Sequence, residues 1–379
     1  MRFFRLALEN WRNFKSVDVA LQQRIFIAGP NASGKSNLLD AMNFLRQLAS
    51  PGGGLQNAVV DRGGISKVRC LAARRYSDIS FAVSIGEDEG EWTYSLTLSQ
   101  DNNRRPIVKT ETVTRGGEII RRRPDEDDKK DAERLTQTHL EQVSANADFR
   151  SIADFLASIR YLHVVPQLIR EPERHKSRLE KERDPYGSDF LEQIAKASDR
   201  VRNSRLLTIM NALTIALPQL QALELERDQV GVPHLRGRFE HWRPKAGWQR
   251  EDQFSDGTLR LIGLLWAVLD GSGPLLLEEP ELSLHPRVVE FIPQMLWNVT
   301  RKRRRQIAIT THSPEMLSDK GIGADEVLLL HPSAEGTKVE VGNENPKVTA
   351  LLKSGLSAAD AALSLVSPEH PERLAEFSE

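Results

Sequence analysis

The chain has 379 residues, of which 39% are hydrophobic and 28% charged, a composition typical of a globular protein with a sizeable core. A formal net charge of −1 excludes a polycation, so any contact with nucleic acid must come from a local basic patch. Cys70 is the only cysteine, which excludes an intrachain disulfide and a cysteine-based zinc site, and no apolar run approaches the roughly 20 residues of a membrane-spanning helix. We therefore expect a cytoplasmic protein without a membrane partner.

The first elements in chain order are two strands, a glycine-containing turn and a helix. Apolar residues predict strands over 3–8 and 17–27, and their helical spacing predicts a helix over 37–48. Residues 29–36 read GPNASGKS, a full match to the phosphate-binding pattern G-x-x-x-x-G-K-S/T between a strand and a helix. The alternative is a glycine-rich turn that only opens a structural helix, which the flanking strand and helix disfavour.

This loop contains the residue types that phosphate binding requires. Glycines let backbone N–H groups turn toward a phosphate, and the N-terminus of the next helix adds the positive end of its dipole. Lys35 brings a cation to the β- and γ-phosphates, and the Ser36 hydroxyl is suited to ligate Mg²⁺. ATP and Mg²⁺ are thus the predicted cofactors. The predicted nucleotide-binding residues of this segment are Gly29, Asn31, Ser33, Gly34, Lys35, Ser36 and Asn37.

The middle of the chain carries less chemical information. Residues 66–120 predict a β-rich meander, and the opposed charge blocks over 121–135 are typical of a mobile, solvated loop. A short strand over 161–165 precedes a charged insertion with a helical pattern, and helix and strand patterns alternate over 254–330, as in an α/β core. The predicted division is an N-terminal lobe over 1–165, a helical insertion over 166–250, a C-terminal core lobe over 251–335 and a tail over 336–379.

A second candidate cluster is the apolar strand that begins at Pro274 and ends in Glu278 and Glu279. It resembles the Walker B motif of ATPases, in which the first acid holds the Mg²⁺ shell and the second polarises the attacking water. The resemblance implies that Glu278 is a metal ligand and Glu279 the catalytic base. Such families usually carry aspartate at the first position, so the extra methylene of Glu278 is a departure. The alternative is a solvated strand end.

Three further segments follow the order of motifs in ABC-type ATPases. The run FSDGTLR over 254–260 resembles the ABC signature, in which Ser255 and Gly257 would bind the γ-phosphate of ATP on the opposite subunit; the alternative is a plain helix cap. His312 follows a predicted strand over 306–310 and resembles the switch histidine that contacts the γ-phosphate. Gln167, between the predicted strand over 161–165 and the helical insertion, stands where the family's Q-loop glutamine would contact Mg²⁺ and water.

Taken in this order, the motifs resemble the RecF, SMC and OLD-like ABC-type ATPases, whose opening segment is also similar to NWRNF over 10–14. The resemblance covers 1–65 and about 250–335. It implies an α/β P-loop NTPase head with an antiparallel β lobe and a short helical insertion. It also implies an ATP-hydrolysing homodimer that sandwiches two ATP molecules head to tail. The short stretch after His312 leaves little room for the TOPRIM nuclease of OLD enzymes, so a nuclease would be a separate protein.

Three roles stay open for such an ATPase. The first is DNA repair or anti-phage defence, with DNA or a partner nuclease; the basic run over 301–305 would supply phosphate contacts, or else only complement the dipole at a helix end. The second is an ABC transporter subunit, which the departure from the usual L-S-G-G-Q signature disfavours. The third is a dimer that clamps ATP without hydrolysing it. Arg12 is a further candidate for phosphate contact, with a surface arginine as the alternative.

Overall fold

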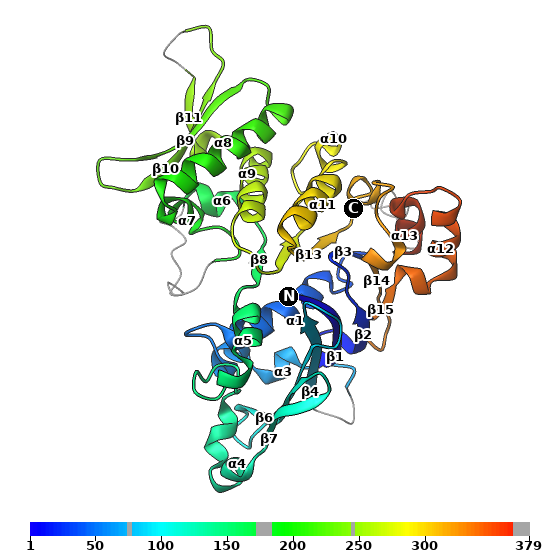
Figure 1. Ribbon diagram of the computed structural model, residues 1–379. Helices are drawn as coiled ribbons and strands as arrows, with labels where there is room; N and C mark the ends of the chain where they lie inside the picture. The colour runs from blue at the N-terminus through cyan, green and yellow to red at the C-terminus, as the bar shows by residue number, and fades with distance from the viewer. Residues whose placement is uncertain (74–77, 172–183, 244–246, 367–379) are drawn as a thin grey trace, which may run out of the picture.

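The computed structural model describes residues 1–73, 78–171, 184–243 and 247–366. Its centre is a six-stranded sheet in the order β15-β14-β3-β13-β12-β8, in which only β15 runs antiparallel to its neighbour (Figure 1). The strands are β3 (Arg24–Ala28), β8 (Arg160–Leu162), β12 (Leu275–Glu278), β13 (Ile307–Thr311), β14 (Val327–His331) and β15 (Lys338–Val341). The predicted α/β class is confirmed.

A second sheet, entirely antiparallel, has the order β2-β1-β4-β5-β6-β7. Its strands are β1 (Arg2–Trp11), β2 (Phe14–Ala20), β4 (Ile79–Gly86), β5 (Trp92–Gln100), β6 (Pro106–Arg115) and β7 (Glu118–Arg123). The predicted meander is therefore present from residue 79 onward. The single strand predicted over 17–27 is wrong, because the chain leaves this sheet after β2 and enters the central sheet as β3.

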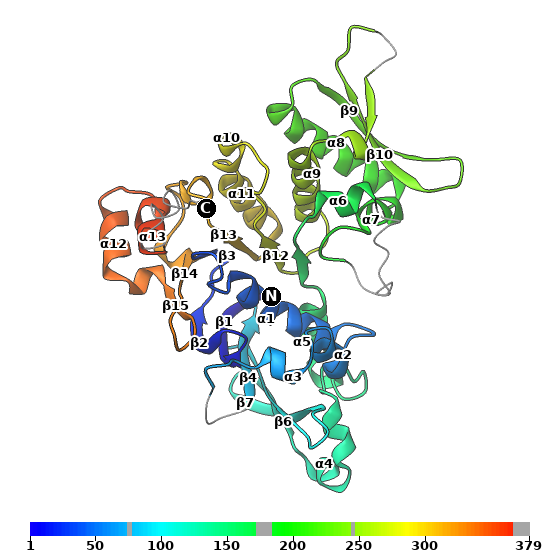
Figure 2. The same ribbon diagram turned by 180° about the vertical axis from the view of Figure 1, so that it is seen from behind.

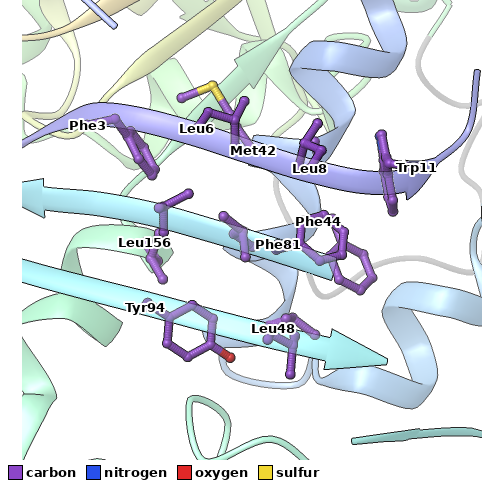
Figure 3. Close-up of a cluster of buried hydrophobic side chains, with 14 of the residues drawn as sticks. Phe3, Leu6, Leu8, Trp11, Met42, Phe44, Leu48, Phe81, Tyr94 and Leu156 are labelled. Atoms are coloured by element: carbon purple, nitrogen blue, oxygen red, sulfur yellow. The ribbon is translucent and has the colours of Figure 1, made fainter. Parts of the chain in front are cut away.

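Helix α1 (Lys35–Ala49) lies between the two sheets and binds them into one core. Its buried face meets side chains from both sheets, and Figure 3 shows β1, α1 and β4 meeting there. The ring centroids of Trp11, Phe44 and Phe81 lie 5.0–5.3 Å apart in tilted, edge-on and stacked pairs, a favourable aromatic arrangement. Smaller helices cover the rest of this side: α2 (Leu55–Val60), α3 (Ile65–Val68) and α5 (Arg150–Ala157).

The charge blocks over 121–135 are largely exposed, as their pattern predicts, but they form regular elements instead of a loop. They form the end of β7, helix α4 (Glu126–Lys130) and a 3₁₀ turn. Arg123 is 1% exposed and makes a fork to Asp128, with Nε–Oδ2 at 2.9 Å and Nη2–Oδ1 at 2.6 Å. A buried ion pair of this kind is tolerated only when its charged groups are hydrogen-bonded. The pattern of charges along the sequence does not indicate that these two residues are buried.

The opposite face of the central sheet packs against a second core and a lobe of its own (Figure 2). The helices here are α6 (Pro166–Arg170), α7 (Phe190–Lys196), α8 (Asp199–Ala216) and α9 (Asp256–Leu269). The lobe also contains an antiparallel sheet of β9 (Leu220–Arg227), β10 (Pro233–Phe239) and β11 (Trp248–Arg250), which the sequence did not reveal beside the predicted helices. Residues 172–183 of the predicted helical insertion lie outside the described residues.

The C-terminal third completes the fold with α10 (Pro286–Val289), α11 (Ile292–Arg303), α12 (Pro346–Lys353) and α13 (Ala358–Val366). The segment predicted as a tail from residue 336 thus contains β15 and two helices, and Val348, Ala361 and Ala362 are buried in the second core. The end of that tail, 367–379, lies outside the described residues. In the part of the chain that the structure describes, no helix has both the length and the apolarity to cross a membrane.

Candidate functional site

The candidate site lies where β3, β12 and β13 end and α1 begins. These strands are parallel neighbours, so their carboxyl ends meet at one edge of the central sheet. Their side chains on one face belong to the core around α1, and those on the other face belong to the core around α9. Burial on both faces explains why the strands read as continuous apolar runs, and the polar residues that follow them gather at the edge.

The turn from β3 into α1 requires glycine at two of its predicted positions. Gly34 has φ +97°, and a Cβ there would lie 2.1 Å from Asn13 Nδ2. A Cβ on Gly29 would lie 2.6 Å from Ser33 Oγ and 2.9 Å from Leu330 Cβ. The loop is therefore packed so closely that its backbone, rather than side chains, lines the cradle. Ser33 Oγ is buried without a hydrogen-bond partner among the described residues.

Lys35 lies folded back over this loop. Its Nζ donates to the carbonyls of Gly29 at 3.0 Å and Pro30 at 3.1 Å, and the residue is 6% exposed. Burial lowers the pKa of Lys35, and the nearby charges of Glu279, Glu281 and Glu278 oppose that shift. The loop thus holds one cation within range of three carboxylates, so added anionic phosphate would need an accompanying divalent cation.

Two residues far apart in sequence anchor the loop from outside. Asn13 Nδ2 donates to Ser33 O and to Thr337 Oγ1, both at 2.8 Å, and Thr337 Oγ1 in turn donates to Ser33 O at 2.8 Å. Asn37, a predicted nucleotide ligand, donates to Asn13 Oδ1 at 2.8 Å, whereas Asn31 is exposed. Asn13 stood in the family-like opening segment, but nothing in the sequence marked Thr337, because only the pairing of β15 beside β14 brings it here.

Glu278 joins the end of β12 to the loop. The Ser36 hydroxyl donates to Glu278 Oε1, and the Tyr161 hydroxyl donates to Glu278 Oε2. His163 Nδ1 lies 4.0 Å from the same Oε2. The fold therefore brings together two of the three predicted Mg²⁺ ligands, and a hydroxyl with a carboxylate is the kind of oxygen set that Mg²⁺ prefers. Tyr161 and His163 are neighbours that sequence reasoning missed.

Glu279 and His312 also meet at this edge. Glu279 Oε1 lies 3.2 Å from His312 Nδ1, and the Glu279 N–H donates to Thr310 O and Thr310 Oγ1, both at 3.1 Å. The Glu279 backbone has φ 41°, a left-handed conformation that costs energy for a non-glycine residue and recurs at functional sites. These contacts hold the carboxylate beside the histidine.

A third acid of this run, Glu281, was not among the predicted site residues. It is 6% exposed, its Oε1 accepts from the Thr311 hydroxyl, and its Oε2 has no hydrogen-bond partner among the described residues. Burial raises the pKa of Glu281. The signal in the sequence that could have identified it is the run Glu279-Pro280-Glu281 directly after the strand.

The signature-like segment opens α9 as a capped helix. Ser255 Oγ accepts from Thr258 N at 3.2 Å, the geometry of the N-cap alternative, while the residue stays exposed. A Cβ on Gly257 would lie 2.5 Å from Ser283 O, so this helix start touches the turn after β12. Gln167 donates to Asp256 Oδ2 at 3.3 Å, which places it beside the signature helix; its assignment to Mg²⁺ stays a prediction.

The remaining basic candidates are mostly paired. Arg12 Nη2 lies 3.1 Å from Asp40 Oδ2. Arg301 is exposed, but Arg305 is 0% exposed and donates to the carbonyls of Ala267 and Gly273, both at 2.6 Å. The prediction of a phosphate-binding patch is therefore wrong for Arg305, because its buried guanidinium hydrogen-bonds to the end of α9 and to the residues before β12.

Comparisons with known proteins identify a family and a fold for this chain. The family described as "AAA domain, putative AbiEii toxin, Type IV TA system" matches residues 24–318. The DNA replication and repair protein RecF of Allorhizobium ampelinum is 44% identical over 110 residues, 29% of this chain and 27% of that protein. The phosphonates import ATP-binding protein PhnC 1 of Synechococcus sp. is 24% identical over 143 residues, 34% of this chain and 52% of that protein.

Both relatives are therefore matched over about half of their length or less. Among solved structures, an Smc head bound to the C-winged helix domain of ScpA aligns with a TM-score of 0.54 at 14% identity. That alignment covers 90% of this chain and 97% of the Smc head, which shows a shared fold.

Proposed function

Since the chain belongs to the AAA-domain family matched above and is a RecF/SMC-like ABC-type ATPase by fold and sequence, we propose that it binds ATP with Mg²⁺ and hydrolyses it. The observation that carries the proposal is the meeting of three distant segments at one sheet edge. Ser36 of the glycine loop contacts Glu278, and Glu279 contacts His312. The charges of both acids also act on Lys35.

Each side chain has a role that its contacts support. The loop backbone and Lys35 bind the phosphates, and Ser36 with Glu278 would hold Mg²⁺, which supplies charge neutralisation when bound. Glu279 takes the proton of the attacking water, and His312 at 3.2 Å fixes the orientation of that carboxylate. Ser313 N–H donates to Thr311 Oγ1 at 3.0 Å, which holds the turn that carries the histidine.

The direct test is nucleotide binding by calorimetry in the wild type and in Lys35→Ala. We expect the variant to lose measurable ATP binding, because the loop then lacks the lysine cation that lies among the charges of Glu278, Glu279 and Glu281. Lys15→Ala is the control, since Lys15 lies on the exposed rim of β2 and pairs with Glu335 at 3.4 Å. Equal ATP affinity in wild type and Lys35→Ala would contradict the assignment of the loop.

The proposed working form is a head-to-tail homodimer. Support comes from Ser255, which is exposed at the start of α9 with Gly257 beside it, the position from which a second copy's nucleotide would be reached. The test is the mass in solution of Glu279→Gln with ATP and Mg²⁺, because blocked hydrolysis should trap the dimer. Ser255→Arg should bind ATP as a monomer and stay monomeric, and a Ser255→Arg protein that dimerises normally would count against the sandwich.

The biological setting is proposed to be DNA repair or anti-phage defence in the cytoplasm, with DNA or a separate nuclease as partner. The repair name of the RecF relative supports the first, and the toxin description of the matched family supports the second. ATP turnover measured with and without duplex DNA tests the DNA branch. The 24% identity to PhnC 1 supports the transporter-type alternative, for which a co-purifying membrane protein would be the sign.

A further inference from the structure

Tyr161 contacts the candidate metal site but belongs to none of the motifs that define it. It lies on β8, the edge strand of the central sheet, which pairs in parallel with β12 in the register Tyr161↔Leu276 and Leu162↔Leu277. Side chains two residues apart on a strand share a face, so Tyr161 and Glu278 lie on the same side of the sheet, the side that α1 covers.

The contact between them is specific. The Tyr161 hydroxyl donates to Glu278 Oε2, and the Ser36 hydroxyl donates to Glu278 Oε1. The two oxygens of one carboxylate are thus assigned to two different donors, one on β8 and one on α1. A tyrosine hydroxyl carries its proton at neutral pH, and an ionised carboxylate oxygen can only accept, so Tyr161 is the donor of this bond.

The contact bears on the unusual acid at this position. A glutamate has one more rotatable bond than the aspartate that such motifs usually carry, so its carboxylate has more orientations to choose from. A hydrogen bond to one oxygen removes that freedom and leaves the other oxygen directed at Ser36. Outer hydrogen bonds of this kind orient metal ligands in many sites.

We propose that Tyr161 is a positioning residue of the Mg²⁺ site, which holds Oε2 of Glu278 so that Oε1 and the Ser36 hydroxyl are presented together to the metal. This inference rests on the proposed ATP–Mg²⁺ function and names a residue that the function itself does not require. It makes the glutamate at 278 and the tyrosine at 161 a matched pair.

The test is the Mg²⁺ dependence of nucleotide binding, measured by fluorescence with a labelled ATP analogue in excess Mg²⁺ and in EDTA. Tyr161→Phe should bind the analogue in EDTA as the wild type does, while its gain in affinity from Mg²⁺ falls by roughly 10-fold or more. Depletion of the free Mn²⁺ signal in electron paramagnetic resonance, with ADP present, should show the same loss.

Tyr94→Phe is the matched control. Tyr94 donates to Glu111 at 2.9 Å and is fully buried in the antiparallel lobe, so its variant also loses a tyrosine–carboxylate bond but far from the metal ligands. The increase in nucleotide affinity that Mg²⁺ causes in Tyr94→Phe, its Mg²⁺ gain, should equal that of the wild type. In the double variant Tyr161→Phe/Glu278→Gln, the Mg²⁺ gain should be no lower than in Glu278→Gln alone, because Tyr161 acts through that carboxylate.

Two results would overturn the inference alone: a Mg²⁺ gain in Tyr161→Phe equal to that of the wild type, or a further loss in the double variant. A wild-type protein that binds the analogue neither in Mg²⁺ nor in EDTA would instead overturn the proposed function, and this inference with it. The first of these results includes the case in which the affinity of Tyr161→Phe drops equally in EDTA and in Mg²⁺, which would assign the bond to structure only.

Discussion

Arg305→Met tests whether the basic run over 301–305, at the end of α11, is a surface patch or part of the core. The guanidinium is 0% exposed; Nε donates to Gly273 O at 2.6 Å, and Nη1 donates to Ala267 O at 2.6 Å and to Asp270 O at 2.9 Å. Burial lowers the pKa of Arg305 to about 10, so the group stays charged at neutral pH. Methionine fills a similar volume but leaves these three carbonyls without their donor.

The expected cost follows from those three bonds. At roughly 1–3 kcal/mol for each buried acceptor left unpaired, the loss spans about 3–9 kcal/mol. Because the variant no longer buries a cation, we expect about 3 kcal/mol, the lower end of that range. Urea unfolding followed by tryptophan fluorescence should show it, with Arg301→Met as the exposed control within about 0.5 kcal/mol of wild type. Equal midpoints for the two variants would refute the structural role of Arg305.

Three other changes test the candidate site and the region beside the antiparallel sheet. Gly34→Ala should weaken ATP binding by roughly 10-fold or more in calorimetry, because φ +97° is strained for alanine and its Cβ would lie 2.1 Å from Asn13 Nδ2; wild-type affinity would show that the loop tolerates a side chain. Glu279→Gln should bind ATP, but its rate of phosphate release should fall by about 100-fold or more. A wild-type rate would show that another residue is the base. Burial, with the nearby charge of Arg123, lowers the pKa of His139 to about 4 from 6.5, so the unfolded chain takes up the proton first and stability is lost as pH falls from 6.5 toward 4. His139→Gln should flatten that part of a urea-midpoint profile, and a profile parallel to wild type would contradict the shift.

The structure changes how the charged segments of this chain are interpreted. Charge blocks predict solvated segments, yet Arg123 and Arg305 are each buried. Arg123 bonds to Asp128 of its own charge block, whereas Arg305 bonds to the carbonyls of Ala267 and Gly273, more than 30 residues away. A buried cation is stable only where the fold supplies a set of acceptors, such as the carbonyls of Ala267, Asp270 and Gly273 around Arg305. That set is assembled by tertiary contacts, so local composition does not distinguish it from a solvated surface run.

The amino-acid sequence by itself determined the parts of this protein whose chemistry is local. The turn over 29–36 needs two glycines and a lysine at a fixed spacing, and the strand before Glu278 and Glu279 needs an unbroken apolar run, so both were identifiable without coordinates. The geometry of the turn depends on residues that are neighbours in the chain, and the burial of a central strand requires apolar residues along its whole length. Both requirements are visible as patterns in the sequence.

Only the tertiary structure decided which side chains share the site. Tyr161 reaches Glu278 because β8 lies beside β12 in one particular register, and Thr337 reaches Ser33 because β15 closes the other side of the same sheet. Each of these contacts joins residues more than a hundred positions apart. The pairing of the strands brings the two residues of each contact together. A single hydroxyl on an edge strand has no periodicity or spacing in the sequence that would reveal its partner.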